Sequence, residues 1–333
     1  GSPPNASTVN FKVHQTVPNL AEVGLGTGGK PSVFNAAGNT DAVVDVEGYV
    51  APASSPSDTS GGFNPLSPAR LADTRAGSGE PDAGQTLGPG QSLTVQVAGV
   101  GGVPGPVTVV ENGHTFQEAL AEAAVLNVTA VDPTQPGFLT VYPTGSSQPL
   151  ASNVNFVSGQ VVPNRVEVPL SNPSGQVSIY NSSGHTDVVV DVSGWYASAL
   201  AASGQGYNPL PPSRIADTRA GSGQLDAGQT LGSGRELPLQ VAGLAGVPAM
   251  GSPQQPTAVV ANVTVTDTSA PSFLTISPVE EFSATSSDLN WVAGDTRANL
   301  VVEPVGLDGR IVVFNAAGQV DVVVDVVGWY SSG

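Results

Sequence analysis

Two short segments of the sequence combine arginine and aspartate in the same order, and their types and spacing could do chemistry. Asp73-Thr-Arg75 lies in LSPARLADTRAGSG, and Asp217-Thr-Arg219 lies in LPPSRIADTRAGSG. A guanidinium group carries five donors in a fixed fork, which fits a carboxylate through two hydrogen bonds. Repeated Arg–Asp pairs can therefore hold a chain segment onto a scaffold, or grip vicinal hydroxyl groups of a sugar.

Two interpretations of these segments stay open. Charged groups inside proteins are usually paired, so we favour a structural role in which arginines hold the segment onto the strand residues Asp191 and Asp325. The arginines available for this role are Arg70, Arg75, Arg214 and Arg219. In the alternative interpretation the segments bind a glycan, and the polar contacts are Asp73, Arg75, Asp217 and Arg219.

Catalysis is not expected from the other reactive residues. The three histidines, His14, His114 and His185, do not occupy equivalent repeat positions, and the sequence has neither a GxSxG elbow nor an HExxH motif. Residues 24–29 satisfy the GxGxxG pattern, but the repeat counterparts LSNPSG and VGLDG read as turns without a following helix. We therefore expect a turn at 24–29, and a protein that is not an enzyme.

Pairs of aspartates recur on one predicted strand, at Asp41/Asp45, Asp187/Asp191 and Asp321/Asp325. Four strand residues span about 13 Å, which is too far for two carboxylates to share one cation directly. Calcium could still bind one of them together with loop carbonyls. We expect no resident cofactor, keep calcium as an alternative, and leave the metal ligands unknown.

Internal repeats organise the chain. The motif VFNAAGNTDAVVDVEGY at 33–49 returns as IYNSSGHTDVVVDVSGW at 179–195 and as VFNAAGQVDVVVDVVGW at 313–329. We predict an N-terminal half-module at 1–52, a first full module at 63–198 and a second at 207–331, joined by linkers of small residues. Residues 8–49 match only the later part of a module. We expect this half-module of three or four strands to dock onto the next module, or to be completed by another chain or an upstream segment.

The fold class follows from alternating valines and turns rich in glycine and proline. We predict an all-β protein of tandem antiparallel modules, β-sandwich or barrel-like. One short helix is expected as an insertion in the first full module, because Thr115–Glu118 forms a capping box ahead of ALAEAA. Trp195, Trp291 and Trp329 exchange with other bulky residues between repeats, which is typical of core positions.

Composition excludes several partners. The net charge is −17, so phosphate backbones and anionic lipids would repel the chain, and we expect neither nucleic-acid binding nor membrane insertion. No apolar run approaches the roughly 20 residues that span a bilayer. The sequence contains no cysteine, so disulfides and thiolate metal sites are excluded.

At PARLADTRAGSG, AVLNVT, LTVYPTG, SNVNF and DVVVDVSGWY, the chain resembles tandem modules in exported proteins of actinobacteria and other GC-rich bacteria. The resemblance covers nearly the whole chain. It implies an accessory or stalk region, with no activity assigned to the pattern itself. We expect a non-enzymatic, extracellular structural or adhesive repeat protein, secreted or attached to the bacterial surface, that self-associates by strand addition or binds a cell-surface glycan. The alternative is a set of carbohydrate-binding modules of a secreted protein.

Overall fold

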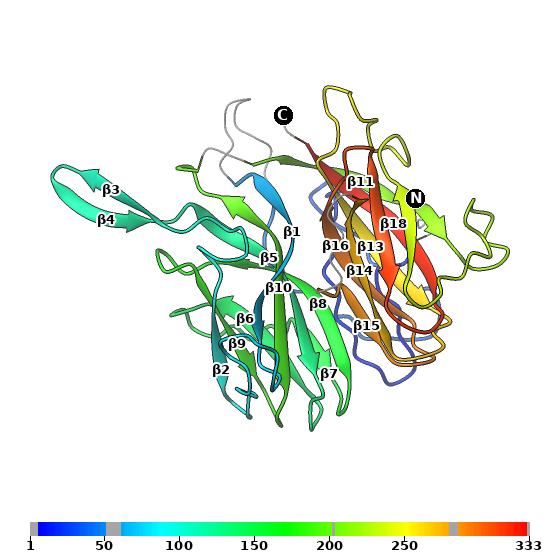
Figure 1. The fold of residues 1–333 in the computed structure, drawn as a ribbon, viewed down its shortest axis with the longest axis horizontal. Helices are drawn as coiled ribbons and strands as arrows, with labels where there is room; N and C mark the ends of the chain where they lie inside the picture. The colour runs from blue at the N-terminus through cyan, green and yellow to red at the C-terminus, as the bar shows by residue number, and fades with distance from the viewer. Residues whose placement is uncertain (1–5, 51–60, 202–203, 280–285, 332–333) are drawn as a thin grey trace.

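The computed structural model describes residues 6–50, 61–201, 204–279 and 286–331. These residues form eighteen strands and no α-helix. Figure 1 shows two β-sandwich modules packed side by side, with the N-terminal segment as a dark-blue trace alongside the second module. The fold is all-β and antiparallel, as the sequence predicts.

The first module consists of two four-stranded sheets. One has the order β1-β10-β5-β8, with β1 at Phe63–Asp73, β10 at Asp187–Ala197, β5 at Ala121–Val131 and β8 at Val161–Pro169. The other has the order β2-β9-β6-β7, with β2 at Ser92–Gln96, β9 at Gln176–Asn181, β6 at Gly137–Pro143 and β7 at Val154–Phe156.

The second module repeats this topology. Its first sheet has the order β11-β18-β13-β16, formed by Gly206–Asp217, Asp321–Ser331, Ala258–Thr266 and Arg297–Pro304. Its other sheet has the order β12-β17-β14-β15, formed by Arg235–Gln240, Arg310–Asn315, Ser272–Pro278 and Leu289–Trp291. Each strand of this module therefore has a counterpart in the first.

A separate apolar core lies between the two sheets of each module. Alternating valines of β10, Val188, Val190 and Val192, point into the first core, and their counterparts on β18 point into the second. The predicted core role of the tryptophans is confirmed for Trp195 and Trp291, which are buried in these cores. Trp329 packs partly buried against the second core.

The helix predicted in the first module is wrong. Val107–Glu111 and His114–Glu118 form a two-stranded hairpin, β3–β4, and the following alanines begin strand β5. The turn residues Asn112 and Gly113 have φ of 52° and 78°, the backbone that a two-residue primed turn requires. A β-branched run followed by Asn-Gly therefore outweighs the capping box. Figure 1 shows the hairpin projecting away from the body of the module.

The three or four strands expected in the N-terminal half-module are also not formed, since residues 6–50 contain no strand. Four segments of this region are the repeat counterparts of strands β7, β8, β9 and β10, namely 9–11, 16–24, 30–35 and 41–50. In the complete modules these strands alternate with β5 and β6, which lie between them in the two sheets. Residues 6–50 have no counterpart of β5 or β6, so none of the four segments has the neighbour with which its backbone would pair.

Candidate functional site

The two DTR segments form the same ion-pair network in each module. Asp73 at the end of β1 accepts hydrogen bonds from Arg75 Nε at 2.8 Å and Nη2 at 2.5 Å, and from Arg70 Nη1 at 2.8 Å. Arg70 also donates from Nε to Asp191 on the neighbouring strand β10 at 2.6 Å. The structure therefore places Arg70 between two carboxylates, with Asp191 as its cross-strand partner.

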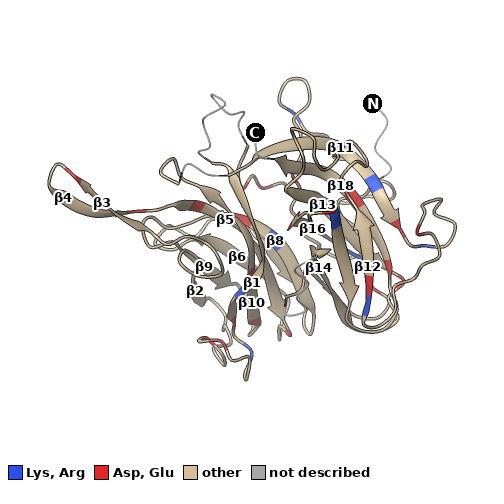
Figure 2. Ribbon diagram, turned by 45° about the horizontal axis from the view of Figure 1, so that its top comes forward, with Lys and Arg blue, Asp and Glu red and all other residues tan. Residues whose placement is uncertain are grey.

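The second module reproduces these contacts. Arg219 donates to Asp217 from Nε at 2.8 Å and from Nη2 at 2.6 Å, and Arg214 bridges Asp217 and Asp325. Figure 2 shows basic and acidic segments adjacent on β11 and β18. Asp191 and Asp325 are thus the partners of Arg70 and Arg214, whereas Arg75 and Arg219 pair with the aspartates of their own DTR segments.

The surroundings of the three kinds of aspartate shift their pKa values in different directions. Burial opposes ionisation of Asp73, but hydrogen bonds and the positive charge of Arg75 outweigh it and lower the pKa of Asp73. For Asp217 the hydrogen bond from Arg219 is the largest effect, and it lowers the pKa. Asp191 is buried more deeply, which raises its pKa to about 6 in spite of Arg70.

Part of the network stays accessible. Asp73 and Asp217 are each 2% exposed, whereas the side chains of Arg75 and Arg219 are 50% and 46% exposed. The aspartates are therefore used within the protein, and the outward edges of the two guanidinium groups are the parts that a ligand could contact.

Two of the three recurrent aspartate pairs, Asp187/Asp191 and Asp321/Asp325, are bonded within the protein. Asp187 accepts hydrogen bonds from Thr74 and Thr86, and Asp321 accepts one from Thr218. Within the described ranges, no group of three or more histidine, aspartate or glutamate side chains is placed to hold a metal ion. The arrangement thus offers one carboxylate at a time, already bonded to a hydroxyl or guanidinium group.

The modules meet at a buried junction that sequence reasoning missed. Arg165 on β8 is 1% exposed and donates to Ser193 Oγ at 2.6 Å, to Asp288 Oδ1 at 3.1 Å and to the Leu300 carbonyl at 3.2 Å. It also contacts Glu303 Oε1 at 3.4 Å. Asp288 and Glu303 belong to the second module, so this guanidinium ties the two modules together.

Burial dominates the titration of both acids at the junction. It raises the pKa of Asp288 against the opposing charge of Arg165. It raises that of Glu303 well above the usual range, with further repulsion from Asp288. One guanidinium group thus faces two buried carboxyl groups, and burial opposes the ionisation of both.

An asparagine at one repeat position makes the same contact at two junctions. Asn299 donates to Asn127 Oδ1 at 3.0 Å and accepts from the backbone N–H of Arg165 at 3.1 Å. Its counterpart Asn19 donates to Asn262 Oδ1 at 2.9 Å and accepts from the N–H of Leu300 at 3.0 Å. The N-terminal segment therefore packs on the second module as the second module packs on the first.

The third junction, between the first module and residues 6–50, is made by carboxyl groups. Glu47 accepts from Asn153 Nδ2 at 2.6 Å and from the N–H of Glu167 at 3.0 Å. Burial raises the pKa of Glu47 to about 7. Nearby, Tyr330 donates to Glu22, Tyr196 donates to Glu167, and the two hydroxyl groups are 2.9 Å apart.

The tyrosines beside these carboxyl groups are buried or half-buried and do not form an exposed surface. Burial and the neighbouring Glu167 raise the pKa of Glu22 well above its usual range. Tyr330 is 1% exposed and its ring lies 4.4 Å from that of Phe63. These aromatic rings form an apolar cluster between the modules.

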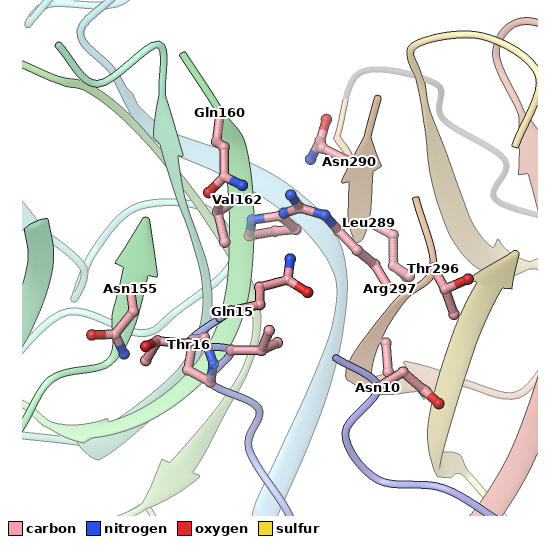
Figure 3. A pocket seen from close by; sticks show the side chains of 14 residues that line it. Asn10, Gln15, Thr16, Asn155, Gln160, Val162, Leu289, Asn290, Thr296 and Arg297 are labelled. Atoms are coloured by element: carbon pink, nitrogen blue, oxygen red, sulfur yellow. The ribbon is translucent and has the colours of Figure 1, made fainter. Parts of the chain in front are cut away.

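Three equivalent positions meet around a small cavity of about 20 Å³, which holds about one water molecule. Asn10, Asn155 and Asn290 occupy the same place in the three repeat copies, and all three line this cavity. Figure 3 shows them approaching from three directions, with Gln15, Gln160 and Arg297 between them. The copies therefore surround one axis in an approximately threefold arrangement, and the space at its centre is too small for a sugar ring.

Arg165 has no repeat counterpart of the same type, because the equivalent residues are Leu20 and Leu300. Comparison between repeats therefore could not identify it. The signal that was available is Asn19, Asn164 and Asn299, because the same residue stands in all three copies at a position that is a strand in both complete modules, where asparagine is disfavoured.

No protein-family model matches the chain, and no curated protein is significantly similar to it. The part of the chain that the structure describes contains no helix long and apolar enough to cross a membrane.

Proposed function

We propose that this chain is a non-enzymatic structural or adhesive repeat protein that acts outside the cell, on the bacterial surface or in secreted form. The observation that carries the proposal is the internal use of the repeated charges. In both modules the buried aspartate of the DTR segment is held by two arginines of the same module. The chemistry that recurs in both modules thus supports the fold.

The junction supports the same proposal. Phe63, Val260, Leu300 and Tyr330 form an apolar cluster between the modules, beside the ion pairs of Arg165. Interfaces of this kind resist relative movement of the two parts. A unit of two rigidly joined modules suits a load-bearing or spacing role, and self-association through residues 6–50 is an extension of it.

A carbohydrate-binding role is the second candidate, because Arg75 and Arg219 keep about half of their side chains exposed beside buried carboxylates. Guanidinium and carboxylate groups together can bind vicinal hydroxyls. The proposed ligand contacts are the exposed edges of Arg75 and Arg219, which the buried Asp73 and Asp217 hold in place. They lie in equivalent places, so such a protein would carry two like sites.

The substitution Arg75→Ala separates the two roles, with the exposed Arg310→Ala as a matched control. The scaffold role predicts a lower free energy of unfolding for Arg75→Ala, measured in urea, and no change in glycan-array binding. Retention on a glycan that disappears in Arg75→Ala, with the urea midpoint unchanged, would establish the binding role instead.

A further inference from the structure

Similar repeat sequences adopt two different states within this chain. Val44 in segment 41–50 is 69% exposed, whereas its counterparts Val190 and Val324 are 0% exposed at the centres of their sheets. Val43, Val46 and Tyr49 are exposed in the same way. An alternating run of valines that lies open to water is an incomplete strand, since each fully buried valine contributes about 1.5–3 kcal/mol.

The complete modules show what covers this sequence. Strand β10 lies between β1 and β5, and its counterpart β18 lies between β11 and β13. Strand β5 also pairs with β8, so it joins the counterparts of segments 41–50 and 16–24. The element that residues 6–50 lack is therefore defined by two examples in the same molecule: a strand with the sequence pattern of AVLNVT or VVANVT.

A buried polar atom shows that the junction between the first module and residues 6–50 is incomplete in this chain. Asn164 is the third member of the asparagine set and is 5% exposed. Its Nδ2 donates to the Asn153 carbonyl, but its Oδ1 has no hydrogen-bond partner among the described residues. The equivalent oxygens of Asn19 and Asn299 both accept from a backbone N–H across a junction. Leaving a buried acceptor unpaired costs about 1–3 kcal/mol.

Repeat equivalence identifies the groups that would complete this junction. Leu20 is the counterpart of Arg165 and Leu300, whose backbone N–H groups donate to the equivalent asparagines. In a complete junction the N–H of Leu20 would therefore donate to Asn164 Oδ1. Asn164 Nδ2 would then donate to the amide oxygen of an asparagine in the added strand, at the position of Asn127 and Asn262. A separate hollow of about 450 Å³ lies between residues 12–16, the start of β6 and the end of β7.

We propose that residues 6–50 are the acceptor half of a third module, completed by a polypeptide that carries the first half of this repeat. Its β5-type strand inserts between segments 16–24 and 41–50, and its β6-type strand between 9–11 and 30–35. Its asparagine reaches Asn164, and three complete modules then surround the axis of Figure 3. The inference rests on the structural role proposed above and replaces self-association by a different occupant of residues 6–50, a polypeptide with the first half of the repeat.

The test joins a donor sequence, a copy of residues 63–143, ahead of the full chain through a flexible glycine-serine linker. Linking supplies the donor at an effective concentration of about a millimolar or more, so absence of binding is informative. The measurement is hydrogen exchange of the amides of residues 41–50. We expect their exchange to slow by at least about hundredfold, while the amides of β1–β18 keep their protection.

The matched control is the double substitution Val44→Asp and Val46→Asp in the acceptor. Both side chains are exposed in the chain alone, so this variant folds as before, but it must lose the donor-induced protection. Unchanged exchange at 41–50 in the linked protein overturns the inference. Protection that appears without donor, together with a mass that grows with concentration, also overturns it, because a second copy is then the occupant. Neither result decides the structural role of the protein, which the Arg75→Ala experiment tests separately.

Discussion

Replacing Arg165 by leucine tests whether the junction depends on a buried ion pair. Arg165 is 1% exposed and bonds to Ser193, Asp288 and the Leu300 carbonyl. Leucine is the residue at the equivalent position of the second module, so it suits the strand. It would leave Asp288 as a buried carboxylate without its cation. Removing one partner of a buried pair costs about 3–5 kcal/mol.

The repeats also supply a compensated variant. At the position of Asp288 the first module has Asn153, and at that of Glu303 it has Val168. The triple substitution Arg165→Leu, Asp288→Asn and Glu303→Val therefore exchanges each charged residue for its repeat counterpart. Uncharged replacement of a buried pair is often neutral or stabilising, so we expect the triple variant to lie within about 2 kcal/mol of the natural sequence.

Urea unfolding followed by tryptophan fluorescence measures both effects, because Trp195 and Trp291 report on separate cores. We expect one transition for the natural sequence and an earlier, broader or divided transition for Arg165→Leu. Arg310→Leu, at an exposed arginine paired with Asp308, serves as the control and should change stability by less than about 1 kcal/mol. The reasoning is refuted if Arg165→Leu behaves like this control, or if the triple variant is as unstable as the single one.

Three further predictions concern other parts of the molecule. Burial raises the pKa of Glu47 from 4.5 to about 7, so its protonated form favours docking. The contribution of Glu47 to the free energy of docking is complete below pH 4.5. It is lost as the pH rises to 7, by at most about 3 kcal/mol. Proteolysis within 41–50 should therefore be faster at pH 8 than at pH 5, and Glu47→Gln should remove the difference; equal dependence in both proteins would contradict this. Gly194→Ala should destabilise by about 1–3 kcal/mol, because the added Cβ would lie 2.2 Å from the Phe63 ring, whereas Gly48→Ala at the equivalent open position should be neutral by thermal unfolding. Replacing the β3–β4 hairpin by the loop of residues 250–256 should shift the melting temperature by no more than about 3 °C, since the hairpin strands pair only with each other; a larger loss would assign the hairpin a place in the core.

The secondary structure of the complete modules could be predicted because its signals are local. The alternation of Val188, Val190 and Val192 and the turn at 181–184 lie within one short stretch. The hairpin was predicted wrongly because two local signals competed, and Asn112-Gly113 outweighed the capping box at Thr115. Local patterns decide an element only when they agree.

The N-terminal segment and the junction could not be predicted in this way. Segment 41–50 has nearly the sequence of β10, so its failure to form a strand depends on absent neighbours. Arg165 has leucine at both equivalent positions, and its partners Asp288 and Glu303 lie in another module. Contacts between distant parts of the chain leave no periodicity in the sequence. By contrast, the Arg–Asp pairing at Asp191 and Asp325 was accessible, because its residues recur together.

The near-identity of segment 41–50 and strand β10 has a consequence for how the chain folds. Both sequences fit beside β5, and the N-terminal copy leaves the ribosome first, so it is already present when β5 emerges. We therefore expect segment 41–50 to compete with β10 for pairing with β5, which would slow refolding. Mutations that weaken the fit of 41–50 beside β5 should speed refolding without changing the final stability of either module.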